Sequence, residues 1–266
     1  MTTTGPTTGT TTNPARSRTA GPLDLHRSLV TAGRVLVQLR GDHRTVALML
    51  VVPVVLTGLV AWIYDGTPVF DHIGPSLVGI FPMVVMFIVT SIATLRERQS
   101  GTLERLLTTP LAKGDLMLGY ALAFGGVVVV QSLLVTGLSV GAFGLDVEGP
   151  LWLLLLVALL AGLLGTSLGL LASGFARTEF QAVQFMPAFV LPQFLLCGLL
   201  TPREDMPAPL AALSDVLPLS YIVDVTHEVA SDPMPWSDSW GPLLVILGFI
   251  VAALALGSAT LRRRTP

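Results

Sequence analysis

Long apolar stretches, separated by short polar segments, dominate the chain. Because an α-helix rises about 1.5 Å per residue, about 20 consecutive apolar residues are enough to cross the hydrocarbon core of a bilayer. We expect helices because a helix satisfies its own backbone hydrogen bonds in lipid. The pattern predicts an all-α membrane protein with six transmembrane helices, at residues 45–64, 76–94, 116–140, 151–173, 183–200 and 242–261.

Two helical features outside these spans are also predicted. In the segment 23–44, Leu25 and Leu29 begin an apolar face at helical spacing, while Arg34 lies on a polar face. This pattern is typical of an amphipathic helix lying in the inner membrane interface, although packing against a soluble partner would also explain it. Residues 201–240 are too polar to cross the membrane, and we expect an outer helical hairpin there, between spans five and six.

The two ends of the chain differ in composition from the membrane domain, which covers residues 45–261. Residues 1–22 are rich in Thr, Gly and Pro, which predicts a disordered cytoplasmic tail. Residues 262–266 carry three arginines and are predicted to form a basic cytoplasmic tail.

The charges between the predicted spans sort onto two sides. Fourteen of the 15 Lys and Arg residues lie on one side, and only Arg203 lies on the other, with most of the acidic residues. The positive-inside rule assigns the basic side to the cytoplasm. We therefore expect a multi-pass protein of the cell inner (plasma) membrane with both termini in the cytoplasm and membrane lipid around it. The net charge of −2 gives no support for nucleic-acid binding.

One serine in the sequence lies in a pattern that is typical of catalytic serines. The run GTSLG at residues 165–169 matches a nucleophile elbow, in which a strand-to-helix turn exposes a serine to a histidine base. Here Ser167 lies within a predicted apolar helix, and all four histidines lie outside the spans. An intramembrane hydrolase using Ser167 is therefore an alternative of another class. Gly162, Gly165 and Gly169 are better explained as small residues that let another helix approach closely.

Metal and nucleotide sites are not indicated. His227-Glu228 begins like a zinc-protease helix, but position 231 is Ser where the second histidine is needed. Cys197 is the single cysteine, so no thiolate cluster is expected. No Gly-rich loop ending in Gly-Lys-Ser or Gly-Lys-Thr occurs. We predict no catalytic residue, metal or cofactor in this chain, which is not expected to be an enzyme by itself.

The cytoplasmic segment 95–115 is the most distinctive part of the sequence. Gly101 favours a break in the helix leaving span two, Thr102 can cap a new helix, and Pro110 disfavours its continuation. The pattern predicts a short helix that projects into the cytoplasm. Its leucines would suit a groove on a partner protein, although an ordinary positive loop that only fixes topology is the alternative.

The run ERQSGTLERLLTTP at residues 97–110 closely resembles the signature after the second span of type 2 ATP-binding-cassette (ABC) exporter permeases. GLLTP at 198–202 and LPLSY at 217–221 resemble the outer hairpin of the same permeases. The resemblance covers roughly residues 23–261 and is closest to the daunorubicin-resistance-like drug permeases.

The resemblance implies a complex of two permease chains with two cytoplasmic ABC ATPase chains, which bind ATP and Mg. It implies multidrug efflux or antibiotic resistance as the process. By the same resemblance, the residues expected to couple to the ATPase are Glu97, Arg98, Gly101, Thr102, Glu104 and Arg105. One departure is the second inner loop, 174–182, which offers only Arg177 and Glu179 as charges.

The spans contain almost no ionisable residues, which argues against proton coupling and favours hydrophobic or amphipathic cargo. Side chains that would contact such cargo, unless they serve only packing, are Met86, Phe87, Gln131, Phe185 and Phe194. Export of cell-envelope lipid or glycolipid remains an alternative to drug export. A membrane anchor or immunity protein that moves no cargo is a further alternative.

Overall fold

The computed structural model describes residues 24–101, 112–234 and 236–260, and every regular element in these ranges is helical. The helices are α1 Leu25–Gly41, α2 His43–Ile63, α3 Val69–Gln99, α5 Lys113–Gly141, α6 Leu151–Ser173, α7 Glu179–Leu196, the 3₁₀ turn η1 Arg203–Asp205, α8 Ala208–Ser214, α9 Pro218–Ser231 and α10 Trp236–Thr260. The expected tails 1–22 and 262–266 lie outside the described residues.

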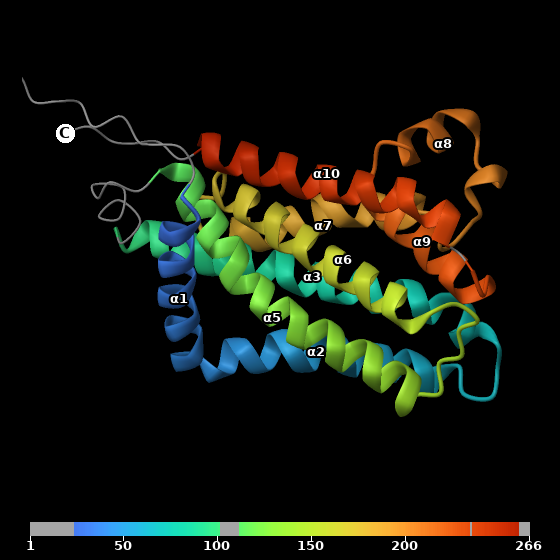
Figure 1. The fold of residues 1–266 in the computed structure, drawn as a ribbon. Coiled ribbons are helices and arrows are strands. Elements are labelled where there is room, and N and C mark those ends of the chain that lie inside the picture. Colours follow the sequence, from blue (N-terminus) through green and yellow to red (C-terminus); the bar gives the residue numbers. More distant parts are fainter. Residues whose placement is uncertain (1–23, 102–111, 235, 261–266) are drawn as a thin grey trace, which may run out of the picture.

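The long helices form one bundle, with shorter helices at its two ends (Figure 1). Helices α2, α3, α5, α6, α7 and α10 run along a common direction, while α1 runs across one end and packs mainly on α5. Helices α8 and α9 lie at the opposite end, where α9 packs on α3 and α10.

Five helices among the described residues are long and apolar enough to cross a membrane: α2, α3, α5, α6 and the Ser239–Thr260 part of α10. The predicted span 183–200 corresponds to α7, which has only 18 residues and carries one Glu and three Gln. Helices α8 and α9 meet at 88° and count as a sixth crossing only if the bent pair is one span. The six predicted crossings are therefore not confirmed and stay a prediction.

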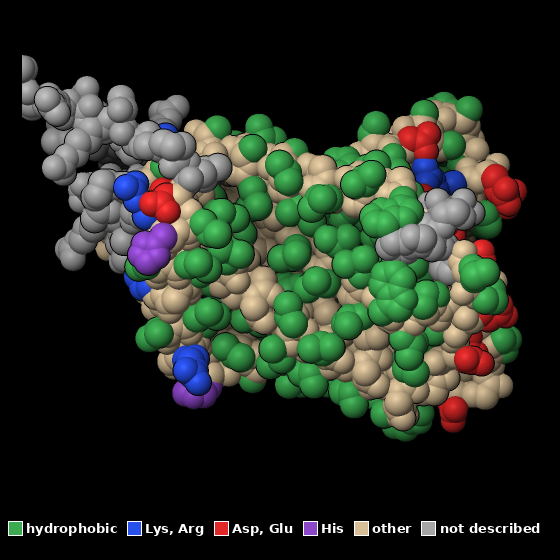
Figure 2. Space-filling model, in the orientation of Figure 1, with side chains coloured by type: hydrophobic (Ala, Val, Ile, Leu, Met, Phe, Trp, Pro, Cys, Tyr) green, Lys and Arg blue, Asp and Glu red, His purple; other side chains and the backbone are tan. Residues whose placement is uncertain are grey.

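The charges gather at the two ends of the bundle. Figure 2 shows Lys and Arg concentrated at the end that carries α1, Asp and Glu mainly at the end that carries α8, and apolar side chains between them. We call these the basic end and the acidic end. Such an apolar belt between two polar ends suits a protein with its middle in hydrocarbon.

Helices α3 and α6 make the most extensive contact in the bundle, and glycines bring their backbones together. A Cβ added at Gly165 would collide with the backbone carbonyl of Met83, and one at Gly169 would lie 2.6 Å from the carbonyl oxygen of Phe87. Small residues allow the two backbones to approach closely, which increases the dispersion contacts between the helices. In a membrane such packing drives helix association, because lipid tails are as apolar as the side chains. The prediction that these glycines let another helix approach closely is confirmed.

Polar contacts hold the acidic end together. Ser76 of α3 and Thr226 of α9 are hydrogen-bonded at 2.8 Å and buried. Arg203, the single basic residue predicted on this side, pairs with Asp224 at 2.5 Å and also with Asp215. The hairpin helices are thereby tied both to the bundle and to each other.

The glycine contact generates a prediction. Gly165→Ala should destabilise the protein by about 1–3 kcal/mol, the usual cost of overpacking, because the new methyl group meets backbone that cannot rotate away. Thermal unfolding of the purified protein in detergent measures the change. Gly248→Ala is the matched control, because a Cβ there meets nothing within 4 Å. Equal melting temperatures for the two variants would show that the close contact does not limit stability.

Candidate functional site

The basic end of α3 is the point where several elements meet. The helix has 31 residues, so it is about 46 Å long and exceeds the roughly 30 Å hydrocarbon core. It ends at Gln99, and Gly101 has φ +72°, a left-handed conformation that glycine adopts without strain. The predicted helix break at Gly101 is therefore present.

Glu97 joins α3 to two other helices. Its carboxylate accepts a hydrogen bond from the Arg34 guanidinium of α1 at 2.5 Å and another from the Tyr120 hydroxyl of α5. Arg34 also donates to the Tyr120 oxygen at 3.2 Å. The Glu97 side chain is only 11% exposed, so the pair is better shielded than a surface ion pair. We call Arg34, Glu97 and Tyr120 the α1–α3–α5 cluster.

The residues next to Glu97 in the sequence bind the connection between α6 and α7, on the other side of α3 from α1 and α5. Arg96 forms a bidentate pair with Glu179 at 2.6 and 2.9 Å. Arg98 donates to the carbonyl of Ser173 at 2.5 Å, and the Gln99 amide donates to the carbonyl of Arg177 at 2.9 Å.

The surroundings shift the pKa of two of these groups. The hydrogen bonds from Arg96 lower the pKa of Glu179, and burial lowers the pKa of Arg98. Charged and amide groups that sequence alone would place in water are therefore bound within the protein. Glu179, in the segment 174–182 that was predicted to be the second inner loop, forms an ion pair with Arg96.

Asp115 anchors the chain where α5 begins. Its buried carboxylate accepts the backbone N–H of Asp24 at 2.8 Å and that of Ala112 at 3.1 Å. Four residues later, Gly119 packs so closely on α1 that a Cβ would lie 2.6 Å from the Cβ of Thr31. The start of α1 and the start of α5 are thus fixed to each other.

The predicted coupling residues divide into two groups. Glu97, Arg98 and Gly101 lie at the end of α3, and the Glu97 and Arg98 side chains bind other parts of this chain. Thr102, Glu104 and Arg105 lie outside the described residues. The described members lie at the C-terminal end of α3, which precedes the segment 102–111 in the sequence.

Sequence reasoning missed Arg34, Tyr120 and Asp115 as partners of this segment. The sequence gave an indication for Arg34, because an arginine on the polar face of an amphipathic helix needs water, a lipid head group or a carboxylate as its partner. Tyr120 gave no such signal, since a tyrosine inside an apolar run is usually part of the core.

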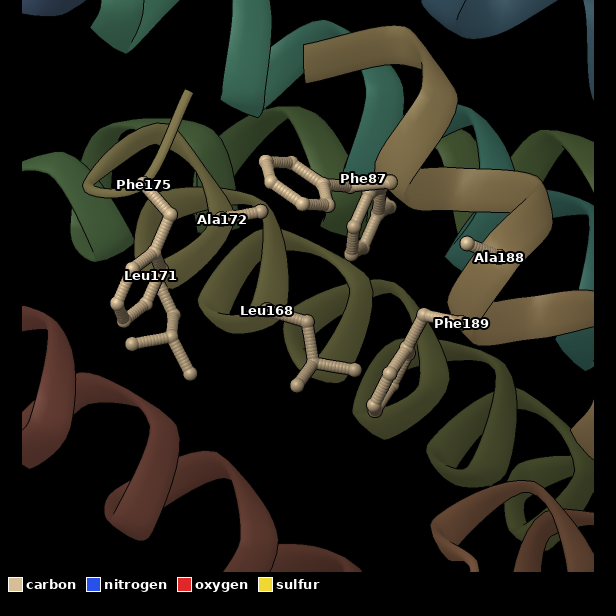
Figure 3. A pocket seen from close by; sticks show the side chains of 8 residues that line it. Phe87, Leu168, Leu171, Ala172, Phe175, Ala188 and Phe189 are labelled. Atoms are coloured by element: carbon tan, nitrogen blue, oxygen red, sulfur yellow. The ribbon is translucent and has the colours of Figure 1, made fainter. Parts of the chain in front are cut away.

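An apolar pocket of about 270 Å³ lies between α3, α6 and α7 (Figure 3). Phe87 of α3 and Phe185 of α7, two of the predicted cargo residues, both line it. The rest of its lining consists of Leu168, Leu171, Ala172, Phe175, Ala188 and Phe189. Figure 3 shows side chains from α6 and α7 directed toward the same space. Aromatic and aliphatic walls of this kind suit an apolar ligand.

The other predicted cargo residues do not line this pocket. Met86 is fully buried against α5, in a cluster with Tyr120 and Phe124. The buried Gln131 amide donates to the carbonyl of Met49 at 2.5 Å and so joins α5 to α2. Phe194 packs against the main core. Two of the five residues thus share a cavity, and the others serve packing in this conformation.

The serine chemistry considered above finds no support in the geometry. Ser167 is almost wholly buried, and its hydroxyl donates to the carbonyl of Leu163 in the same helix at 2.8 Å. His72 and His227 stack on each other at the acidic end, 5.2 Å between ring centres. Among the described residues, no group of three or more His, Cys, Asp or Glu side chains is placed to hold a metal ion.

Comparison with known proteins identifies the family of this chain. The family model described as ABC-2 type transporter matches residues 28–229. The chain is 33% identical over 176 residues to the probable multidrug ABC transporter permease YbhR of Escherichia coli (strain K12), covering 65% of this chain and 48% of that protein.

More distant relatives extend the comparison. The chain is 28% identical over 165 residues to the inner membrane transport permease YhhJ of the same organism, covering 62% of this chain and 44% of the relative. It is 21% identical over 196 residues to ABC transporter G family member 20 of Dictyostelium discoideum, covering 73% of this chain and 27% of the relative. The chain thus spans about half the length of its bacterial relatives, or less. Because the family match includes most of the chain, this protein belongs to the ABC-2 type transporter family.

Proposed function

We propose that this chain is the membrane-spanning permease subunit of an ATP-driven exporter of hydrophobic or amphipathic compounds. In this proposal α2, α3, α5, α6, α7 and α10 cross the membrane, with the basic end and both termini in the cytoplasm. The family membership, the permease names of the relatives and the charge difference between the two ends support it.

The observation that carries the coupling role is that both ends of the segment 102–111 are anchored. Before the segment, Glu97 of α3 binds Arg34 of α1. After it, Asp115 of α5 binds the backbone N–H of Asp24, the residue that precedes α1. Arg96, Arg98 and Gln99 extend the anchorage to α6 and α7. A displacement of this segment by a partner would therefore be passed to α1 and α7 together, rather than absorbed by a loose loop.

The complete exporter would contain two ATPase subunits, which bind and hydrolyse ATP with Mg, and a second permease chain. Helix α7 suits a contact with that second chain, because only three of its 18 residues are buried here. Its exposed apolar residues include Phe180, Leu191 and Leu195. Co-purification tests this assembly, because the proposal requires a cassette ATPase whose hydrolysis responds to hydrophobic compounds.

Drug export and export of a cell-envelope lipid or glycolipid both fit an apolar pocket. We favour drugs as cargo because the pocket is small and aromatic, and because two relatives are named multidrug permeases. Drug susceptibility and lipid analysis of a deletion strain separate the two. Unchanged drug susceptibility together with loss of an envelope lipid would show that the cargo is a lipid and not a drug.

The α1–α3–α5 cluster predicts a coupling defect. Glu97→Ala removes the group that binds Arg34 and Tyr120, so α1 should no longer follow movements of the segment 102–111. Drug-stimulated ATP hydrolysis should fall severalfold while basal hydrolysis by the co-purified ATPase persists. Hydrolysis and transport, measured on the same reconstituted preparation, show whether the two activities separate.

A double-mutant cycle distinguishes coupling from general damage. Glu97→Ala and Arg34→Ala should be non-additive by about 0.5–3 kcal/mol in unfolding free energy, as for residues in direct contact. Arg27→Ala is the control, because this arginine lies on the same helix in an exposed pair with Asp24. Transport at wild-type level in both Glu97→Ala and Arg34→Ala would show that the α1–α3–α5 cluster takes no part in coupling.

The pocket predicts a separate effect on cargo. Ala172→Phe should fill the space beside Phe87 and Phe185, so that a fluorescent hydrophobic substrate binds at least several times more weakly. Basal ATP hydrolysis should remain, because Arg98 binds the backbone carbonyl of the neighbouring Ser173, and the substitution keeps that carbonyl. Ala252→Phe, on the exposed side of α10, is the matched control. If both variants bind substrate as the wild type does, cargo does not use this pocket.

A further inference from the structure

A groove lies at the elbow where α1 turns into α2. Its floor and walls are apolar and come from three helices: Leu36 and Leu39 of α1, Val46 and Ala47 of α2, and Val127 of α5. The groove has a volume of about 460 Å³ and is open on one side.

Two basic side chains stand at the rim of this groove. They are Arg40, in the last turn of α1, and His43, the first residue of α2. Within the described part of the chain, neither takes part in a hydrogen bond or ion pair. Figure 2 shows basic and histidine side chains gathered at the corner of the molecule where α1 meets α2, next to apolar side chains.

Asp42, which lies between Arg40 and His43 in the sequence, forms its hydrogen bonds elsewhere. Asp42 accepts hydrogen bonds from the backbone N–H and the hydroxyl of Thr45, at 3.1 and 2.6 Å. It lines a neighbouring groove between α1 and α3, together with Arg96, and is absent from the lining of this one. The rim therefore presents uncompensated positive charge above an apolar floor.

The surroundings point to lipid as the occupant. The groove lies next to an exposed apolar part of α2, where Val51 and Val55 are each at least 49% exposed. It also lies at the basic end, where α1 runs across the ends of the other helices (Figure 1). A ligand here has one end beside Arg40 and the other beside the apolar belt.

We infer that the α1–α2 elbow is a binding site for an anionic phospholipid. The phosphate lies at Arg40 and His43, and one acyl chain lies in the groove over Leu36 and Val127. The Arg40 guanidinium can bind an anionic head group, and the His43 ring can donate a hydrogen bond to it. The aliphatic part of an arginine side chain covers apolar surface while its charged end stays at the interface. The inference requires the protein to be in a membrane, but it does not depend on drug export.

The test uses the full chain, purified in detergent with an equimolar mixture of phosphatidylglycerol and phosphatidylcholine. Lipid retained on the protein is counted by native mass spectrometry. Wild type should retain phosphatidylglycerol in preference, and Arg40→Ala should lower that preference about fivefold, the effect expected of one basic residue near an anionic lipid. Arg27→Ala, at the other end of the same helix, is the control for diffuse charge attraction.

A second pair of variants tests the apolar floor without altering charge. Val127→Trp should fill the groove and displace the retained phospholipid, whereas Val130→Trp, on an exposed face of the same helix, should not. Added inorganic phosphate should leave retention unchanged because it has no acyl chain. Equal losses for Arg40→Ala and Arg27→Ala, or normal retention in Val127→Trp, would overturn the site.

Discussion

The backbone contact between α3 and α6 is the constraint on which the rest of the structure depends. At Gly165 and Gly169 the two helices touch without side chains between them, so α3 cannot slide or rotate without separating from α6. Helix α3 also runs without a break from the acidic end to the basic end. Helix α3 is therefore held rigidly along its length, so that a movement at one end is transmitted to the other.

The polar contacts at the two ends of this rod serve different purposes. At the acidic end, Ser76 binds Thr226 and so attaches the bent α8–α9 pair. At the basic end, Glu97 faces α1 and α5, while Arg96 and Arg98 face the α6–α7 connection. Successive residues of a helix point to different sides, so this short run reaches three neighbours. The shielded carboxylate of Glu97 would be costly alone and is tolerated because Arg34 and Tyr120 bind it, whereas Arg96 and Glu179 stay about half exposed.

Much of this arrangement could be predicted from sequence, because the bilayer imposes simple rules on length and charge. Five of the predicted spans coincide with apolar helices, and the helix break at Gly101 follows from its conformational freedom. The inward direction of Glu97 could not be predicted, since a charged residue next to a membrane is as easily solvated as paired. Its partner Arg34 lies 63 positions earlier, and only the crossing of α1 over the bundle brings the two together.

Cargo residues were harder still to predict, because packing and binding use the same side chains. Phe87 and Phe185 share a pocket, whereas Gln131 is occupied by the Met49 carbonyl, and local sequence does not distinguish these outcomes. The same ambiguity applies to α1, whose buried face packs on α5 while Arg34 reaches Glu97 and Leu36 lines the elbow groove. Lipid at the elbow would therefore act on the helix that also carries the coupling pair. Val127→Trp changes the groove and leaves that pair in place, so the two roles of α1 can be separated by experiment.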